Sequence, residues 1–437
     1  MRKSAIALSA AFASLFSVAT PVVSDVTMTQ EGYTVTINYT LSSEAGIVTV
    51  DIQTNATGGA WASIGGEHLT HFSGDVNKLV ETGPRTMTWK PREAWPENAL
   101  KLNAKAVVRA WAKSAPPDYM VASLTVPNSV AFYACKESIP DGVTNDLYKT
   151  EYLVMRKCPA ANVTWRMGSP STETGRSSWR EAPHLVTIPA DYYIGVYPVT
   201  QRQYELIMTS GTTSYNVKPS NFKNPDYYAT RSVENVSYNT LRGSTNESEN
   251  INWPTTGSTV KSGTFFSLLR VFTGLGGFDL PTEVQWEFAC RAGCGTALFN
   301  GQDLEDGDTS ERLNLLARYA RNGGFPGGDS NVEPANGCAP DLGSPKVGSY
   351  QPNDWGIYDM LGNMWEWCLD WYQHTAPTGT DALIGPTECS ENTGRVCRGG
   401  SWRNGASNCR CAERQGLDPT SSWSSIGFRV ACPAAIP

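Results

Sequence analysis

Hydrophobic and polar residues alternate in short runs over the first quarter of the chain. The clearest runs are residues 33–39, 46–52, 85–89 and 100–109, and glycine, proline and asparagine separate them. Period-two alternation of β-branched and aromatic residues between turn formers is typical of antiparallel strands. We therefore predict an immunoglobulin-like β-sandwich over residues 25–127.

The pattern changes after this region. No sustained periodicity appears in residues 128–150, which we interpret as a linker. Residues 151–434 then contain few helical signals between long stretches rich in glycine, proline, asparagine and tryptophan. This composition predicts a second domain of ordered loops around a small sheet, and a mixed α+β, loop-rich fold for the whole chain.

Two helices of the second domain are signalled by capping boxes at residues 200–203 and 282–285. In this motif a threonine hydroxyl and a glutamine side chain bind amide groups that the first helical turn leaves unpaired. Residues 264–273 and 310–320 are further helix candidates, because their apolar residues recur at helical spacing.

The first residues have the pattern of an export signal. Met-Arg-Lys precedes a small and apolar stretch over residues 5–19, and small residues lead up to Asp25. We predict a signal peptide at residues 1–24 and a secreted or periplasmic protein. A membrane anchor is the competing interpretation, but it requires about 20 apolar residues, and three serines interrupt this stretch. No later segment is apolar enough to predict a membrane span.

Charge and cysteine content narrow the function further. The formal net charge is -7 and no dense run of lysine and arginine occurs, which argues against a nucleic-acid partner. Eleven cysteines behind an export signal predict disulfides in an oxidising compartment, and an odd number leaves at least one unpaired.

Four motifs in the second domain occur in a fixed order. They are Tyr-Pro-Val-Thr-Gln at 197–201, Leu-Pro-Thr-Glu-Val-Gln-Trp-Glu-Phe-Ala-Cys-Arg-Ala-Gly at 280–293, Trp-Gly-Ile-Tyr-Asp-Met-Leu-Gly-Asn-Met-Trp-Glu-Trp at 355–367, and Arg-Gly-Gly-Ser-Trp at 398–402 with Gly-Phe-Arg-Val at 427–430. In this order and spacing the chain resembles the formylglycine-generating enzyme, or sulfatase-modifying factor, family. The resemblance implies a variant of the C-type lectin fold with a small twisted sheet.

The resemblance also implies a reaction that this chain does not support. In catalytic members, oxygen oxidises a peptide cysteine to formylglycine at a copper(I) ion held by two thiolates shortly after the Gly-Gly-Ser motif. Here Asn404 stands at the position of the first thiolate, and the loop is shorter, so the second falls at Ala406 or in the gap. An amide oxygen is a poor ligand for a soft cuprous ion. The sequence therefore argues against copper.

The remaining cysteines leave two interpretations open. The resemblance implies a disulfide between Cys290 and Cys411, and Cys368 and Cys409 form a second candidate pair. Alternatively, Cys409 and Cys411 form a replacement copper or redox site, because side chains two apart on a strand share a face. We favour the bridged interpretation.

A calcium site is the cofactor prediction that the resemblance supports. The residues at its ligand positions are Asp359, Gly362, Met364 and Glu366. Two carboxylates and two carbonyl groups suit a hard cation. A second family site would begin at Asn322 and Gly323. The competing interpretation is that Asp359 caps a turn and that Glu366 pairs with an arginine, Arg398 or Arg403.

Arg403, Asn404 and Trp423 are candidates for the face that holds the substrate peptide in catalytic relatives. Two functions remain. The first is a non-catalytic, exported binding or structural module with a calcium-stabilised lectin-like domain, whose partner is an exported protein, a peptide or a glycan. The second is a formylglycine-generating type of oxidoreductase with a rearranged centre, acting on protein cysteines. Loss of both copper ligands favours the first.

Overall fold

The structure is a computed structural model, and it describes residues 20–55, 59–96, 103–243, 259–323, 343–374, 378–379 and 394–436. Residues 1–19 of the predicted signal peptide lie outside these ranges, as do Cys338 and Cys389. Its residues 22–24 already belong to the first strand of the fold, so the predicted boundary at residue 24 does not match the start of that strand. Among the helices in the described ranges, none has the length and apolar composition that crossing a bilayer requires.

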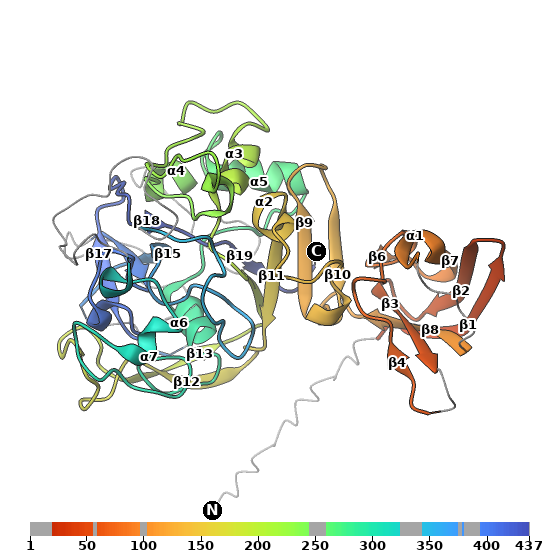
Figure 1. The fold of residues 1–437 in the computed structure, drawn as a ribbon, viewed down its shortest axis with the longest axis horizontal. Coiled ribbons are helices and arrows are strands. Elements are labelled where there is room, and N and C mark those ends of the chain that lie inside the picture. Colours follow the sequence, from red (N-terminus) through yellow and green to blue (C-terminus); the bar gives the residue numbers. More distant parts are fainter. Residues whose placement is uncertain are drawn as a thin grey trace, which may run out of the picture.

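Two antiparallel sheets form the N-terminal part, drawn in red and orange in Figure 1. The first contains, in spatial order, β1 (Val22–Glu31), β2 (Thr34–Ser42), β7 (Gly83–Trp89) and β5 (Phe72–Gly74). The second contains β4 (Ala62–Ser63), β3 (Gly46–Asn55) and β6 (Lys78–Val80), with β8 (Asn103–Trp111) paired to β3. A short helix, α1 (Pro91–Ala94), follows β7.

The alternation seen in the sequence corresponds to strands with one buried face. In β2, Val35, Ile37, Tyr39 and Leu41 are buried, and the residues between them are at least partly exposed. These side chains share one apolar core with residues of the second sheet. Because the side-chain period of a strand is two, this pattern also sets which face of β2 points inward. The immunoglobulin-like class of these two sheets stays a prediction.

A five-stranded sheet runs across the boundary that we placed at residue 127. Its order is β10 (Val130–Tyr133), β9 (Tyr119–Ser123), β11 (Tyr152–Cys158), β14 (Tyr192–Gly195) and β19 (Ala431–Pro433). Strand β9 lies in the range predicted for the sandwich, yet it pairs with β11. Strand β10 and helix α2 (Leu147–Thr150) lie in the predicted linker, 128–150. The predicted boundaries at residues 127 and 150 do not match this pairing, because β9 and β10 belong to the same sheet as strands of the second domain.

Both predicted capping boxes are confirmed. Thr200 precedes α3 (Gln201–Met208) and Thr282 precedes α6 (Glu283–Arg291). In each, the threonine hydroxyl accepts a hydrogen bond from the glutamine amide at the third helical position, and the glutamine side chain accepts one from the threonine amide. The second helix ends at Ala292, which adopts the left-handed conformation.

The remaining helices are short. They are α4 (Tyr238–Arg242), α5 (Phe265–Thr273) and α7 (Glu311–Asn314). Helix α5 confirms the prediction for residues 264–273, whereas only α7 and a 3₁₀ turn at residues 320–322 form regular helix around the predicted segment 310–320. Figure 1 shows α3, α4 and α5 together at one end of the larger body, with α5 in contact with both others.

Two further sheets complete the fold. One pairs β12 (Val163–Met167) with β13 (His184–Ile188). The other has the order β17 (Arg414–Leu417), β16 (Arg395–Arg398), β15 (Trp365–Trp371) and β18 (Ile426–Gly427). Strands β15, β16 and β18 carry or adjoin the two C-terminal motifs, and α6, which carries the motif at residues 280–293, packs on β15 and β16. Val199 of the first motif belongs to the same apolar core. The motifs therefore meet around one apolar core.

Candidate functional site

A turn of two glycines at the end of β16 determines the geometry of the predicted face. Gly399 and Gly400 have left-handed φ angles of 94° and 73°. A side chain on Gly400 would place its Cβ 2.8 Å from Cys409 Sγ, and residues other than glycine are disfavoured at such φ angles. The turn directs Ser401 and Trp402 inward, where both are fully buried.

Asn404 lies in this turn, at the position implied for the first copper thiolate. Ser401 Oγ donates a hydrogen bond of 2.5 Å to Asn404 Oδ1, and the Asn404 carbonyl accepts one of 2.9 Å from Ala320 N. The amide oxygen is therefore already held by a neighbouring hydroxyl, and it is a hard donor where copper(I) prefers sulfur. The residues present do not fit the family's copper centre.

Cys409 and Cys411 are buried in different surroundings. Cys409 Sγ lies 3.9 Å from the Ser401 carbonyl, and burial raises the pKa of Cys409 to about 12. Cys411 lies beside Cys290 of α6, and their thiol groups interact directly. Residues 409–411 form a turn, so the strand geometry that would place both side chains on one face does not apply. Both members of the 290–411 pair are thiols in this structure, and their disulfide stays a prediction.

Cys368 lies on β15. Burial raises the pKa of Cys368 well above the usual range. Asp370 of the same strand and Cys397 of the neighbouring strand β16 raise this pKa further. Cys409, by contrast, lies against Gly400 and Ser401. The pairing of Cys368 with Cys409 also stays a prediction.

The two halves of the predicted face are joined through a buried tryptophan. Trp402 Nε1 donates a hydrogen bond of 3.0 Å to the Ser424 carbonyl. Trp423 beside it is 48% exposed, and its carbonyl accepts a hydrogen bond of 3.1 Å from Asn235 N. Arg403 is partly exposed on the turn. The structure therefore brings the two segments of the face together.

The predicted calcium turn contains a buried ion pair. Arg429 donates from Nε to Glu366 Oε2 at 2.6 Å and from Nη2 to Oε1 at 2.8 Å. Trp286 Nε1 donates to the same Oε2 at 2.7 Å. An arginine does neutralise this glutamate, as the competing interpretation proposed, but it is Arg429 and neither Arg398 nor Arg403.

Asp359 provides the second carboxylate of this turn. Its Oδ2 accepts a hydrogen bond of 2.7 Å from Gly348 N, and burial raises the pKa of Asp359 to about 6. Within the described ranges, no cluster of three or more histidine, cysteine, aspartate or glutamate side chains could hold a metal ion. Calcium would therefore also need the carbonyl groups of Gly362 and Met364, with Glu366 shared. These hard oxygens suit calcium in kind, and the site stays a prediction.

The second predicted calcium site begins at Asn322 and Gly323. Asn322 Oδ1 accepts a hydrogen bond of 2.8 Å from Tyr319 N, and Nδ2 donates one of 2.7 Å to the Ala317 carbonyl. The side chain therefore closes a turn. The residues that follow Gly323 lie outside the described ranges.

A buried cluster of charges anchors the segment after the face. Arg410 Nη1 bonds Glu173 at 2.6 Å and Glu181 at 2.8 Å, and its Nη2 bonds Glu413 at 3.1 Å. Arg180 bonds Glu413 at 2.6 Å. Burial raises the pKa of Glu413, whereas hydrogen bonds from Arg410 overcome burial and lower the pKa of Glu181. The sequence did not indicate this cluster, since no spacing links partners so far apart.

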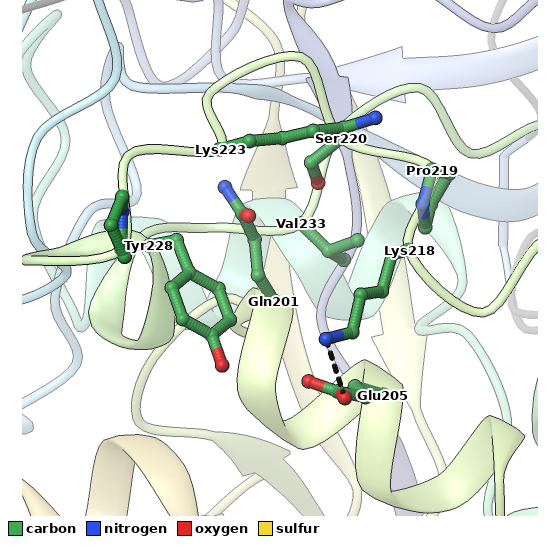
Figure 2. Close-up of a pocket in the computed structure, with 9 residues that line it drawn as sticks. Gln201, Glu205, Lys218, Pro219, Ser220, Lys223, Tyr228 and Val233 are labelled. Carbon is green, nitrogen blue, oxygen red and sulfur yellow. Dashed lines mark ion pairs between the residues drawn. The ribbon is translucent and has the colours of Figure 1, made fainter. Parts of the chain in front are cut away.

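A cavity of about 320 Å³ lies between α3 and the segment at residues 218–233 (Figure 2). Helix α3 contributes Gln201 and Glu205, and the segment contributes Lys218 and Tyr228 among others. Lys218 Nζ lies 2.9 Å from Glu205 Oε1. The sequence did not indicate this cavity, because all of its lining residues except Gln201 lie outside the four motifs.

Residues next to the cavity lining in sequence contact the predicted face. Phe222 packs edge-on against Trp402, with 5.6 Å between the ring centres. Asn235, whose backbone amide binds the Trp423 carbonyl, also donates from Nδ2 to Asn221 Oδ1 at 3.0 Å. The cavity and the face therefore belong to one region of the molecule.

The sheet of motif-bearing strands with α6 packed upon it, and the glycine turn beside it, define a sulfatase-modifying factor domain. The family model described as "Sulfatase-modifying factor enzyme 1-like domain" matches residues 156–434, which is more than half of the chain. The chain belongs to this family, as a divergent member.

The relatives of this chain include formylglycine-generating enzymes, a protein named inactive and a protein named a chaperone. The chain is 33% identical over 158 residues to the formylglycine-generating enzyme of Mus musculus, covering 36% of this chain and 39% of that protein. It is 35% identical over 169 residues to the "Inactive C-alpha-formylglycine-generating enzyme 2" of Mus musculus, covering 37% and 45%. It is 28% identical over 274 residues to the "Chaperone protein LppX" of Paenibacillus barcinonensis, covering 59% and 85%. The chain thus spans about two fifths of the first enzymes it matches.

Proposed function

We propose that this chain is a non-catalytic, exported binding or structural module whose family domain presents the face of Arg403, Asn404 and Trp423. The observation that carries the proposal is the hydrogen bond of 2.5 Å between Ser401 and Asn404, at the position where the family's reaction requires a thiolate. Burial of Cys409 supports it, because a pKa near 12 keeps this thiol protonated at neutral pH.

The names of the relatives support a domain that keeps the family fold without the family reaction. The chain is similar to formylglycine-generating enzymes and also to a protein that is named inactive. Another relative is named a chaperone, and the match covers 85% of that protein. A partner that is an exported protein, a peptide or a glycan is consistent with these names.

A turnover assay tests the proposal. The purified chain is incubated with copper(I), oxygen and a sulfatase-type Cys-x-Pro-x-Arg peptide, with an active formylglycine-generating enzyme in a parallel reaction. We expect the peptide mass to remain unchanged with this chain and to change with the enzyme. Thiol-to-aldehyde conversion by this chain would overturn the proposal in favour of a rearranged oxidoreductase, and Cys409→Ser and Cys411→Ser would then show whether either thiol is required.

The proposal includes four further features. These are a signal peptide at residues 1–24, an immunoglobulin-like sandwich after it, a disulfide between Cys290 and Cys411, and a calcium ion held near Asp359 and Glu366. Two sheets around a common core support the sandwich, and the direct contact between the two thiols supports the disulfide. N-terminal sequencing of the exported protein tests the first feature, because we expect it to begin at Asp25.

A further inference from the structure

The cavity beside the face combines a carboxylate, an aromatic ring and two ammonium groups (Figure 2). Its volume of about 320 Å³ lies at the lower end of the range for small-molecule pockets, roughly 300–1,000 Å³. A carboxylate and an ammonium group next to an aromatic ring suit a ligand with both hydroxyl groups and an apolar face.

Glu205 provides an acceptor that the protein leaves incompletely used. Its Oε1 pairs with Lys218 Nζ at 2.9 Å. Its Oε2 lies 3.4 Å from Arg202 Nη1 and is buried, so it is not open to the cavity. A carboxylate oxygen accepts more than one hydrogen bond, so Oε1 has room for a donor besides Lys218. A ligand hydroxyl group in the cavity that Glu205 lines would supply that donor.

Tyr228 provides the aromatic wall. Its ring lies 5.9 Å from Lys218 Nζ, and Figure 2 shows the side chain next to Gln201. The ring offers an apolar surface, and its hydroxyl group offers a polar tip. A sugar ring has the same combination, with C–H groups on its faces and hydroxyl groups around its edge.

Lys223 adds a positive charge that no nearby ion pair neutralises. Lys223 forms no ion pair among the described residues, and the group on which its charge acts is the buried Glu234 carboxyl behind the wall. Lys218 and Arg202 already flank Glu205. The cavity therefore has an excess of positive charge on a chain whose formal net charge is -7. This excess favours a ligand that carries a negative charge.

We propose that this cavity binds an acidic monosaccharide, with a sugar hydroxyl group at Glu205, the ring against Tyr228 and the carboxylate near Lys223. The inference rests on the proposed binding role and names the class of ligand. It concerns a small-molecule site, and it requires no chemical step.

Saturation-transfer NMR and calorimetry with the full chain test the site. The probes are D-glucuronate, D-glucose as the neutral match, and D-gluconate as an open-chain carboxylate of the same charge. We expect glucuronate to bind roughly tenfold or more tightly than glucose, because one charge-assisted hydrogen bond is lost with glucose. Absence of glucuronate binding, equal binding of glucose, or equal binding of gluconate would each overturn the assignment.

Variants locate the site. Lys223→Ala should weaken glucuronate binding roughly tenfold and leave glucose binding unchanged. The reason is that this exposed side chain contacts only the carboxylate of the bound sugar, which glucose lacks. Tyr228→Ala should weaken both ligands. Lys136→Ala, at an exposed lysine in another part of the chain, is the matched control and should change neither.

The outcomes separate this inference from the proposed function. If Lys223→Ala binds glucuronate as tightly as the native chain, the site is overturned. The proposed non-catalytic role would still stand if the chain does not convert the peptide. Turnover of the peptide by a chain that still binds glucuronate would overturn the non-catalytic role and support the site.

Discussion

Glu234 lies fully buried behind the wall of the cavity, and its replacement by glutamine is a sharp test of the electrostatics there. One of its oxygens accepts hydrogen bonds from the backbone amides of Asn221 and Phe222, the latter at 3.0 Å. The other oxygen has no hydrogen-bond partner within the described residues. Burial raises the pKa of Glu234 from 4.5 to about 8, against the opposing effect of these amides and of Lys223.

The raised pKa sets the sign of a pH dependence. Between pH 4.5 and about 8 the folded state keeps the proton on Glu234 and the unfolded state does not. The free energy of unfolding therefore falls as pH rises through this window. The gap of about 3.5 pH units corresponds to at most about 5 kcal/mol. Glutamine has nearly the same shape and cannot ionise, so Glu234→Gln should remove this fall.

Denaturant unfolding from pH 5 to pH 9 measures the effect. We expect Glu234→Gln to match the native chain at pH 5 and to exceed its free energy of unfolding by several kcal/mol at pH 9. Glu31→Gln, at an exposed glutamate at the end of β1, is the matched control and should follow the native chain throughout. Parallel curves for Glu234→Gln and the native chain would refute the reasoning.

Arg429→Met should lower the free energy of unfolding by about 3–5 kcal/mol, because it leaves the buried Glu366 carboxylate without its guanidinium partner; a loss below about 1 kcal/mol in denaturant unfolding would argue against that ion pair. Peptide mapping without reductant should recover Cys290 and Cys411 in one linked pair of fragments, and two alkylated thiols at these positions would contradict the disulfide. Calcium should stabilise the native chain by about 2.7 kcal/mol at a hundred times its Kd, and should not stabilise Asp359→Ala; a melting temperature that EDTA leaves unaltered would count against the site.

Local signals predicted local structure well. A capping box involves residues within one turn, so Thr200 and Thr282 mark the starts of α3 and α6 without reference to the rest of the fold. Alternation likewise predicted β2 and the buried face of that strand. The four ordered motifs were sufficient to predict the family.

Contacts between distant residues could not be predicted in this way. The sequence suggested Arg398 or Arg403 as the partner of Glu366, whereas Arg429 makes the ion pair. The sequence likewise did not indicate that β9 pairs with β11 or that Arg410 is buried among glutamates, because these partners are far apart along the chain.

The sequence by itself indicated β2 and its buried face, the capped starts of α3 and α6, and the family that the second domain resembles. The tertiary structure alone decided which arginine neutralises Glu366, how the five-stranded sheet crosses residue 127, and where α3 and the 218–233 segment enclose a cavity. The reason is physical. Capping and alternation depend on neighbours along the chain, whereas ion pairs, sheet order and cavities depend on which surfaces the folded core brings within a few ångströms of one another.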